Sequence, residues 1–135
     1  MINRFFRRFI PGKAESITVK VVPSDTGMLF VRLCVNDRMR AQIKCVRQSQ
    51  TTILIGDILH NNEDFDYNRG YGSAMMEKLL DYARGNGITY IHGNLSEVDL
   101  GHKDRLHHFY GKFGFTITEF PELQNNYYGK IELHL

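Results

Sequence analysis

The feature that most constrains the fold is a buried strand followed, after a polar loop, by a glycine pair and a helix. Residues 52–59 are almost uninterruptedly apolar and rich in Ile, which is typical of a strand covered on both faces. Beyond the glycines Gly70 and Gly72, apolar side chains recur at helical spacing, at Met75, Met76, Leu79, Leu80 and Ala83. The sequence therefore predicts a strand, a turn and a helix that begins at about this glycine pair.

The start of that helix is a candidate anion site. The first N–H groups of a helix have no partner within it, and the helix dipole places partial positive charge there. Glycines also let a ligand approach the backbone closely. Because a glycine pair before a helix also suits a tight turn that binds nothing, other parts of the chain must separate the two interpretations.

Two motifs flank the next predicted strand, residues 88–95. Tyr67-Asn68-Arg69-Gly70-Tyr71-Gly72 precedes it, and Tyr110-Gly111-Lys112-Phe113-Gly114-Phe115 follows it. In this order they resemble two signatures of the GNAT superfamily of acyl-CoA-dependent N-acetyltransferases, Gln/Arg-x-x-Gly-x-Gly/Ala and Tyr-x-Lys-x-Gly-Phe. The resemblance covers residues 52–135, and it departs from the first signature at Tyr67.

The resemblance implies one α+β domain over residues 1–135 with a GNAT-like acyl-CoA N-acyltransferase fold. Alternating patterns and turn residues predict an antiparallel meander of four strands, at residues 17–22, 28–35, 39–46 and 52–59. A strand, a helix and a strand then predict a right-handed parallel crossover, so the central sheet is mixed. A second helix from about His102 and two closing strands complete the pattern. The family's two helices between its first and second strands are reduced here to five turn residues.

The first 13 residues combine basic and aromatic side chains. We expect a short amphipathic helix that packs Phe6, Phe9 and Ile10, with a membrane-surface anchor as the alternative. No long apolar region follows, so the segment lacks the pattern of a secretory signal. No apolar run approaches the roughly 20 residues that a membrane span needs. We therefore expect a soluble protein.

The resemblance assigns the acetyl-CoA site to two segments. Backbone N–H groups from Arg69 to Ser73 would hold the diphosphate, and the full set of residues there is Asn68, Arg69, Gly70, Tyr71, Gly72 and Ser73. The strand end at Ile58, Leu59 and His60 would splay from residues 91–95 and pair with the pantetheine arm. A backbone N–H at Ile58 or His60 would then donate to the thioester carbonyl as it becomes an oxyanion.

The resemblance also implies which residue gives a proton to the coenzyme A thiolate. The choice of the base that takes a proton from the amine rests on the residues of one strand. Tyr110 matches the tyrosine that protonates the coenzyme A thiolate in many family members, although spacing alone favours a core tyrosine beside Phe109. Asp57 is our choice for the base, because an acid in an otherwise apolar strand costs free energy unless it has a task or a partner. Glu97 and His60 are the alternatives.

Metal binding is not expected. His92, His102, His107 and His108 show no zinc spacing with cysteines or acids, so we interpret them as surface histidines. Asp64-x-Asp66-x-Asn68 resembles the start of a calcium loop, but the glycine comes one place late and Met75 stands where a glutamate is needed.

The two cysteines are not expected to form a disulfide. In a tight hairpin Cys34 pairs near residues 39–41, short of Cys45, so both cysteines are predicted to be reduced thiols in a cytoplasmic protein.

The predicted function is transfer of an acetyl group from acetyl-CoA to a primary amine, on a small molecule or a protein. The alternative is a non-catalytic acyl-CoA-binding or protein-interaction module on a trimmed GNAT fold, which the reduced helices and Tyr67 favour. A nucleic-acid binder is disfavoured by the formal net charge of +2. The reduced helices leave the acceptor side open or completed by a second subunit of a homodimer.

Overall fold

The computed structural model describes residues 3–10, 13–60 and 70–135. The strands of the N-terminal half are β1 (Asn3–Ile10), β2 (Lys13–Pro23), β3 (Met28–Val35), β4 (Arg38–Arg47) and β5 (Thr52–His60). The C-terminal half holds α2 (Tyr71–Gly85), β6 (Tyr90–Ser96), the 3-10 helix η1 (Glu97–His102), α3 (Lys103–Lys112), β7 (Thr116–Gln124) and β8 (Tyr127–His134). These elements confirm the predicted α+β fold with a mixed sheet.

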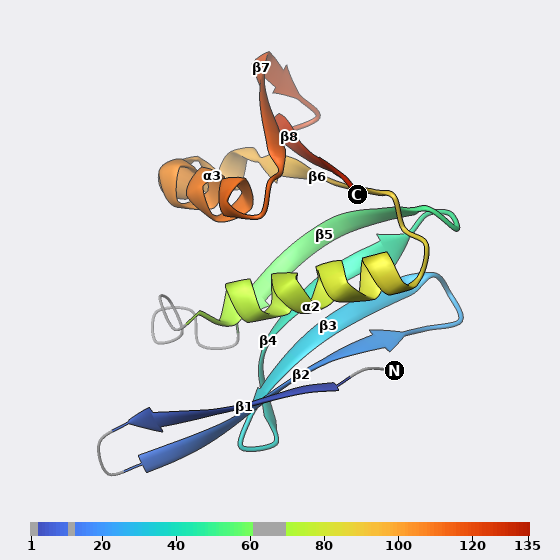
Figure 1. The fold of residues 1–135 in the computed structure, drawn as a ribbon. Helices are drawn as coiled ribbons and strands as arrows, with labels where there is room; N and C mark the ends of the chain where they lie inside the picture. The colour runs from blue at the N-terminus through green and yellow to red at the C-terminus, as the bar shows by residue number, and fades with distance from the viewer. Residues whose placement is uncertain (1–2, 11–12, 61–69) are drawn as a thin grey trace.

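The strands form one sheet in the order β1-β2-β3-β4-β5-β6-β8-β7. Neighbours from β1 to β5 are antiparallel, which confirms the meander, while β5 and β6 are parallel because α2 carries the chain back between them. Strand β8 lies between β6 and β7, so the last strand of the chain is internal and β7 is an edge strand. Figure 1 shows α2 lying across β2 to β5, and α3 beside β6 to β8.

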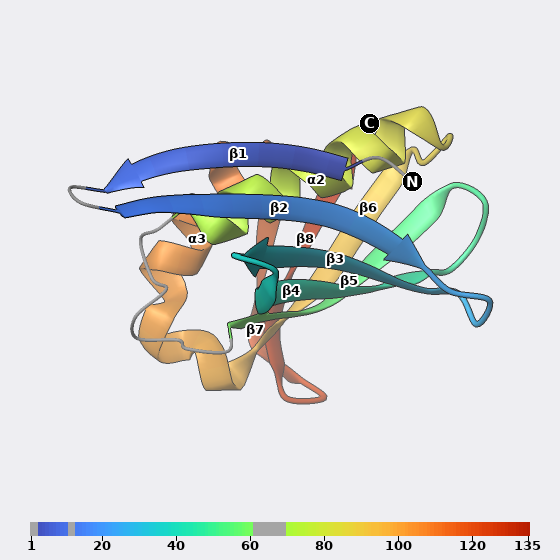
Figure 2. The ribbon, with the colours of Figure 1, turned by 90° about the horizontal axis from the view of Figure 1, so that it is seen from below.

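The N-terminal segment is a strand, so the helix predicted for residues 1–13 is wrong. β1 pairs antiparallel with β2 from Asn3↔Lys20 to Ile10↔Lys13, and Figure 2 shows the two strands running side by side. Aromatic and β-branched residues favour strands when a neighbouring strand offers an edge. The edge of β2 supplies that partner, and the pairing overrides the weak helical pattern of a short segment.

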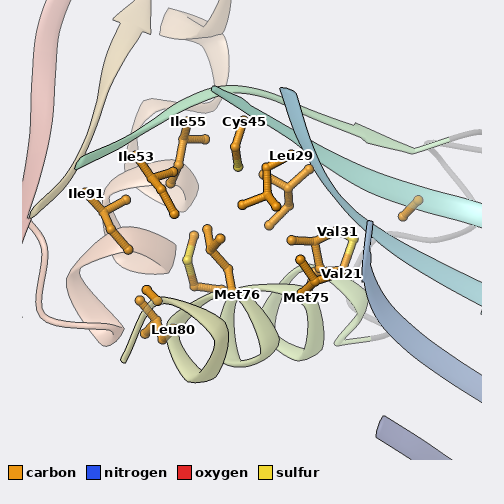
Figure 3. Packing of buried hydrophobic residues seen from close by; sticks show 14 of the residues in the cluster. Val21, Leu29, Val31, Cys45, Ile53, Ile55, Met75, Met76, Leu80 and Ile91 are labelled. Carbon is orange, nitrogen blue, oxygen red and sulfur yellow. The ribbon is translucent and has the colours of Figure 1, made fainter. Parts of the chain in front are cut away.

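The core lies between α2 and the sheet. β3 and β4 alternate between buried and half-buried side chains, and their buried face is turned toward α2. Met75, Met76 and Leu79 are fully buried on the facing side of α2. Figure 3 shows Met76 of α2 opposite Ile53, Ile55 and other apolar side chains of the strands. No helix in the described part of the chain has the length and apolar character to cross a membrane.

Candidate active site

The parallel strands β5 and β6 separate halfway along their length. Their pairing runs from Thr52↔Tyr90 to Ile55↔Gly93 and stops there, although β5 continues to His60. From Asp57 onward β5 is paired with β4, while its other edge has no partner strand in the described ranges. Figure 1 shows β5 and β6 diverging toward the end where α2 begins and α3 lies. The result is a gap with an unpaired strand edge that an extended ligand can join.

A β-bulge at Gly56 accompanies this separation. Cys45 pairs with Ile55, but the next residue of β4, Lys44, pairs with Asp57, so Gly56 is the extra residue. A Cβ on Gly56 would lie 3.2 Å from the Lys44 carbonyl oxygen, which explains why glycine fits here. Because a bulge bends its strand and increases the local twist, it directs the second half of β5 away from β6.

The bulge also determines where Asp57 lies. Ile53 and Ile55 are buried, and a regular strand would bury the side chain at position 57 as well. The extra residue shifts the alternation, so that Asp57 is exposed while Ile58 packs against the core. The burial argument for Asp57 as a base is therefore wrong, and its catalytic role stays a prediction.

Helix α2 begins with an open N-terminus. Gly70 is its N-cap in the left-handed conformation, with φ of 79°, and its carbonyl accepts from the Ala74 N–H at 3.0 Å. Within the described residues no side chain caps the helix, and no acidic residue lies in its first turn. The described residues therefore leave the N–H groups of Tyr71, Gly72 and Ser73 to an anion. The predicted ligands Asn68 and Arg69, and the calcium-like segment, lie outside the described residues.

The two residues after Gly70 also contribute to packing. A Cβ on Gly72 would lie 3.1 Å from the Phe109 ring, so this glycine lets α3 approach the start of α2. The Tyr71 side chain is buried, and its hydroxyl has no hydrogen-bond partner among the residues that the structure describes. Gly72 is thus required by the fold as well as suited to a ligand, and Tyr71 can offer a ligand its backbone N–H.

Lys112 lies beside the start of α2, where sequence reasoning did not place it. Its Nζ donates to the Ser73 Oγ at 2.6 Å, and it lies over the rings of Phe109 and Phe113 at 5.5 and 5.3 Å. The cation is exposed and stands at the open end of α2, where it adds charge for an anion. The second motif contains Lys112, but no sequence spacing places it beside a residue 39 positions away.

Tyr110 of α3 is buried in the hydrophobic core. Its ring makes edge contacts with Phe109 and Phe115 at 5.3 and 5.4 Å. Burial raises the pKa of Tyr110, and Asp99, Cys45, Tyr128 and Asp57 raise it further. The side chain therefore stays a neutral phenol, the form that donates a proton. Asp57, the other predicted catalytic residue, is among the groups that raise this pKa.

The alternative bases, His60 and Glu97, both lie at strand ends. His60 is the last residue of β5. Glu97 begins η1 beyond the end of β6, with its backbone N–H donating to the Asn126 carbonyl at 2.9 Å. Both therefore lie at strand ends near the gap, as expected, and neither position selects a base.

The histidines are less uniform than predicted. His102 and His108 are exposed, whereas His92 and His107 are half-buried. The Nε2 of His92 lies 2.6 Å from the Gln48 Oε1, and the Nε2 of His107 lies 3.1 Å from the Tyr128 hydroxyl. No group of three or more potential metal ligands occurs among the described residues.

The two cysteines lie in neighbouring strands. In the β3–β4 hairpin Cys34 pairs with Met39, which confirms the predicted register, and both cysteines are free.

Three comparisons with known proteins bear on this site. Residues 64–115 match the model of the acetyltransferase (GNAT) family. A Bacillus subtilis protein, uncharacterized protein YocC, is 42% identical over 50 residues, which span 37% of this chain and 30% of that protein.

Two solved structures share the fold over most of the chain. The GNAT domain of S. lividans PAT has a TM-score of 0.69 at 13% identity, with 98% of this chain and 97% of that chain covered. A GNAT family acetyltransferase from Elizabethkingia anophelis, solved with acetyl-CoA bound, has a TM-score of 0.67 at 15% identity, with 88% and 98% covered. The chain has the GNAT fold, and the resemblance to the GNAT superfamily is confirmed.

Proposed function

We propose that this protein is an acetyl-CoA-dependent N-acetyltransferase that acylates a primary amine by direct attack. One observation carries the proposal: the edge of β5 that is freed where β5–β6 pairing stops lies toward the start of α2, which no side chain of the described residues caps. The segment that matches the GNAT family model runs from just before α2 to just after α3, and so includes the helix start and Tyr110. An acyl-CoA needs both parts, an anion site for its diphosphate and an extended edge for its pantetheine arm.

Binding would use backbone groups and one charged side chain. The N–H groups of Gly72 and Ser73, with Lys112 beside them, supply positive potential for the diphosphate. Asn68 and Arg69 are further ligands of the diphosphate in this proposal. The free edge of β5 at Ile58, Leu59 and His60 would align the pantetheine, and a backbone N–H there would stabilise the oxyanion by about 3 kcal/mol.

Proton transfer would use the two predicted side chains. A primary amine with a pKa of about 10 is protonated at neutral pH, so a base must accept a proton before the amine attacks. Asp57 is exposed beside the gap and can accept this proton through water. Tyr110 is held neutral by burial, and it would donate its hydroxyl proton to the departing thiolate.

The cellular setting and the acceptor belong to the same proposal. Free cysteines suit a reducing compartment, which supports the cytoplasm. The acceptor class is a primary amine on a small molecule or a protein. A second subunit remains one way to complete the acceptor side, and the mass of the protein in solution, measured by light scattering, tests it.

Binding and turnover should be measured separately to test the proposal. Acetyl-CoA should raise the Tm, and thiol release should depend on an amine drawn from a panel of polyamines, lysine peptides and small amines. Tyr110→Phe should keep the Tm shift but lower kcat about 100-fold, whereas Tyr127→Phe, an exposed control, should change neither. Stabilisation by acetyl-CoA without turnover on any amine would instead identify the non-catalytic module.

A further inference from the structure

A second tyrosine of the candidate site is joined to a histidine. Tyr128 of β8 is buried, and its hydroxyl lies 3.1 Å from the Nε2 of His107 on α3. Their rings are stacked, with centroids 6.0 Å apart and planes 18° from parallel. The phenol is therefore fixed against α3 by both a hydrogen bond and a ring contact.

The helix places this pair next to Tyr110. His107 and Tyr110 are three residues apart on α3, a spacing that puts side chains on neighbouring positions of one helix face. Tyr128 packs along the same stretch of α3, because the Nζ of Lys103, one turn before His107, lies 5.9 Å from its ring. Tyr128 also contributes to the raised pKa of Tyr110.

The charged groups around the pair come from three elements. Lys103 of α3 makes a salt bridge with Glu119 of β7, and Asp99 of η1 raises the pKa of both phenols. Burial raises the pKa of Tyr128, and Asp99 and Glu119 raise it further. Both tyrosines are thus neutral near pH 7, and His107 is half-buried.

We propose that Tyr128 and His107 are positioning residues that act through Tyr110 and return a proton to it after each turnover. This inference rests on the proposed function, because it requires Tyr110 to protonate the thiolate. A buried phenolate costs free energy because its charge is desolvated, so a path that returns a proton to Tyr110 would speed the recovery of the neutral phenol. An imidazole suits the outer end of such a path because one ring nitrogen can give a proton while the other takes one up.

Each transfer in the path breaks one bond to hydrogen and forms another. The Tyr110 O–H bond breaks as the S–H bond of coenzyme A forms. Tyr128 then gives its hydroxyl proton to the Tyr110 oxygen across a water. His107 gives its Nε2 proton to the Tyr128 oxygen as its Nδ1 takes up a proton from solvent, so the ring stays neutral. Exchange with solvent then returns the ring proton from Nδ1 to Nε2, so the site returns to its starting state without an oxidant or a reductant.

The chain offers a matched control for each residue. Tyr127→Phe is the control for Tyr128→Phe, and His108→Ala is the control for His107→Ala, because each control side chain is an exposed neighbour on the same element. We expect Tyr128→Phe and His107→Ala each to lower kcat about tenfold, with KM for acetyl-CoA unchanged. The double variant should be no slower than the slower single variant, because both residues belong to one path.

Chemical rescue separates proton return from a structural role. Added imidazole should raise the rate of His107→Ala in a concentration-dependent way and leave the wild type and His108→Ala unchanged. If Tyr128→Phe unfolds below the assay temperature, its kcat cannot be measured, and the rescue of His107→Ala by imidazole then tests the relay by itself. Unchanged kcat, additive losses or a lack of rescue would overturn the relay while leaving the acetyltransferase intact. A wild type that binds acetyl-CoA but acylates no amine would overturn the proposed function, and the relay with it.

Discussion

At Gly56 a single extra residue sets both the direction of β5 and the environment of Asp57. The sequence shows an acid in an apolar strand, and a regular strand would place it toward the core. The bulge depends on how β4 and β5 pair, with Lys44 opposite Asp57 and Cys45 opposite Ile55. A register shift of this kind comes from tertiary pairing, so an apolar pattern within one strand cannot predict it.

Gly56→Ala should lower the free energy of unfolding by about 1 kcal/mol, because its Cβ would lie 3.2 Å from a backbone carbonyl oxygen that cannot easily move. Gly85→Ala is the control with the opposite expected sign. Gly85 ends α2, and the space that a Cβ would occupy there is open, so alanine should stabilise the helix by about 0.5 kcal/mol. Urea unfolding of both variants measures the difference, and equal effects would contradict the packing argument.

Cys45 predicts how stability changes at alkaline pH. Burial raises the pKa of this thiol from 9.0 to about 12, so the unfolded chain loses the proton at a lower pH than the folded protein does. The stabilisation is fully present below pH 9 and is lost as the pH rises from 9 toward 12. Each unit of pH within this window should cost about 1.4 kcal/mol.

A comparison of Cys45→Ala with the wild type at pH 8 and pH 10.5 isolates this effect. The wild type should lose about 2 kcal/mol more of its free energy of unfolding than the variant does over this interval. Cys34→Ala controls for the removal of a thiol as such. Parallel stability curves for wild type and Cys45→Ala would show that the thiol does not titrate differently in the two states.

Among the elements, the start of α2 and the end of α3 form one unit. Phe109 fills the space that Gly72 leaves, and Lys112 donates to Ser73. The sequence predicts both helices and both motifs, because 3.6-residue periodicity and glycine stops are local signals. It does not predict that Lys112 meets Ser73, since that contact depends on how the two helices pack.

Lys112→Gln should weaken acetyl-CoA binding about fivefold, because it removes one charged group from the helix start. The loss should shrink at high salt, as expected for a screened interaction at an exposed site. Lys130→Gln, which changes a partly exposed lysine of β8, is the control and should bind normally. Titration calorimetry at two salt concentrations measures both affinities for acetyl-CoA. Equal affinities for the two variants would show that Lys112 does not contribute to binding.

At the scale of the whole molecule, the sequence predicts the order of strands and helices but not every partner. The meander and the crossover follow from alternation, turn residues and the handedness of parallel connections. The pairing of β1 with β2, and the insertion of β8 between β6 and β7, depend on which strand edges remain free after the rest has folded. The pattern of residues 1–13 predicts a helix only when the segment is considered alone, because the pattern does not reveal that the edge of β2 is free to pair with it.

The central claim is that acyl-CoA binds between the start of α2 and the splayed edge of β5. Titration of isotope-labelled protein with coenzyme A, followed by backbone amide NMR, tests it most directly. The account predicts that the largest amide shifts fall at Gly70, Gly72 and Ser73 and at Ile58 and Leu59, with smaller shifts at Lys112. Shifts confined to other strands, such as the β7–β8 hairpin, or no binding at millimolar coenzyme A, would contradict it.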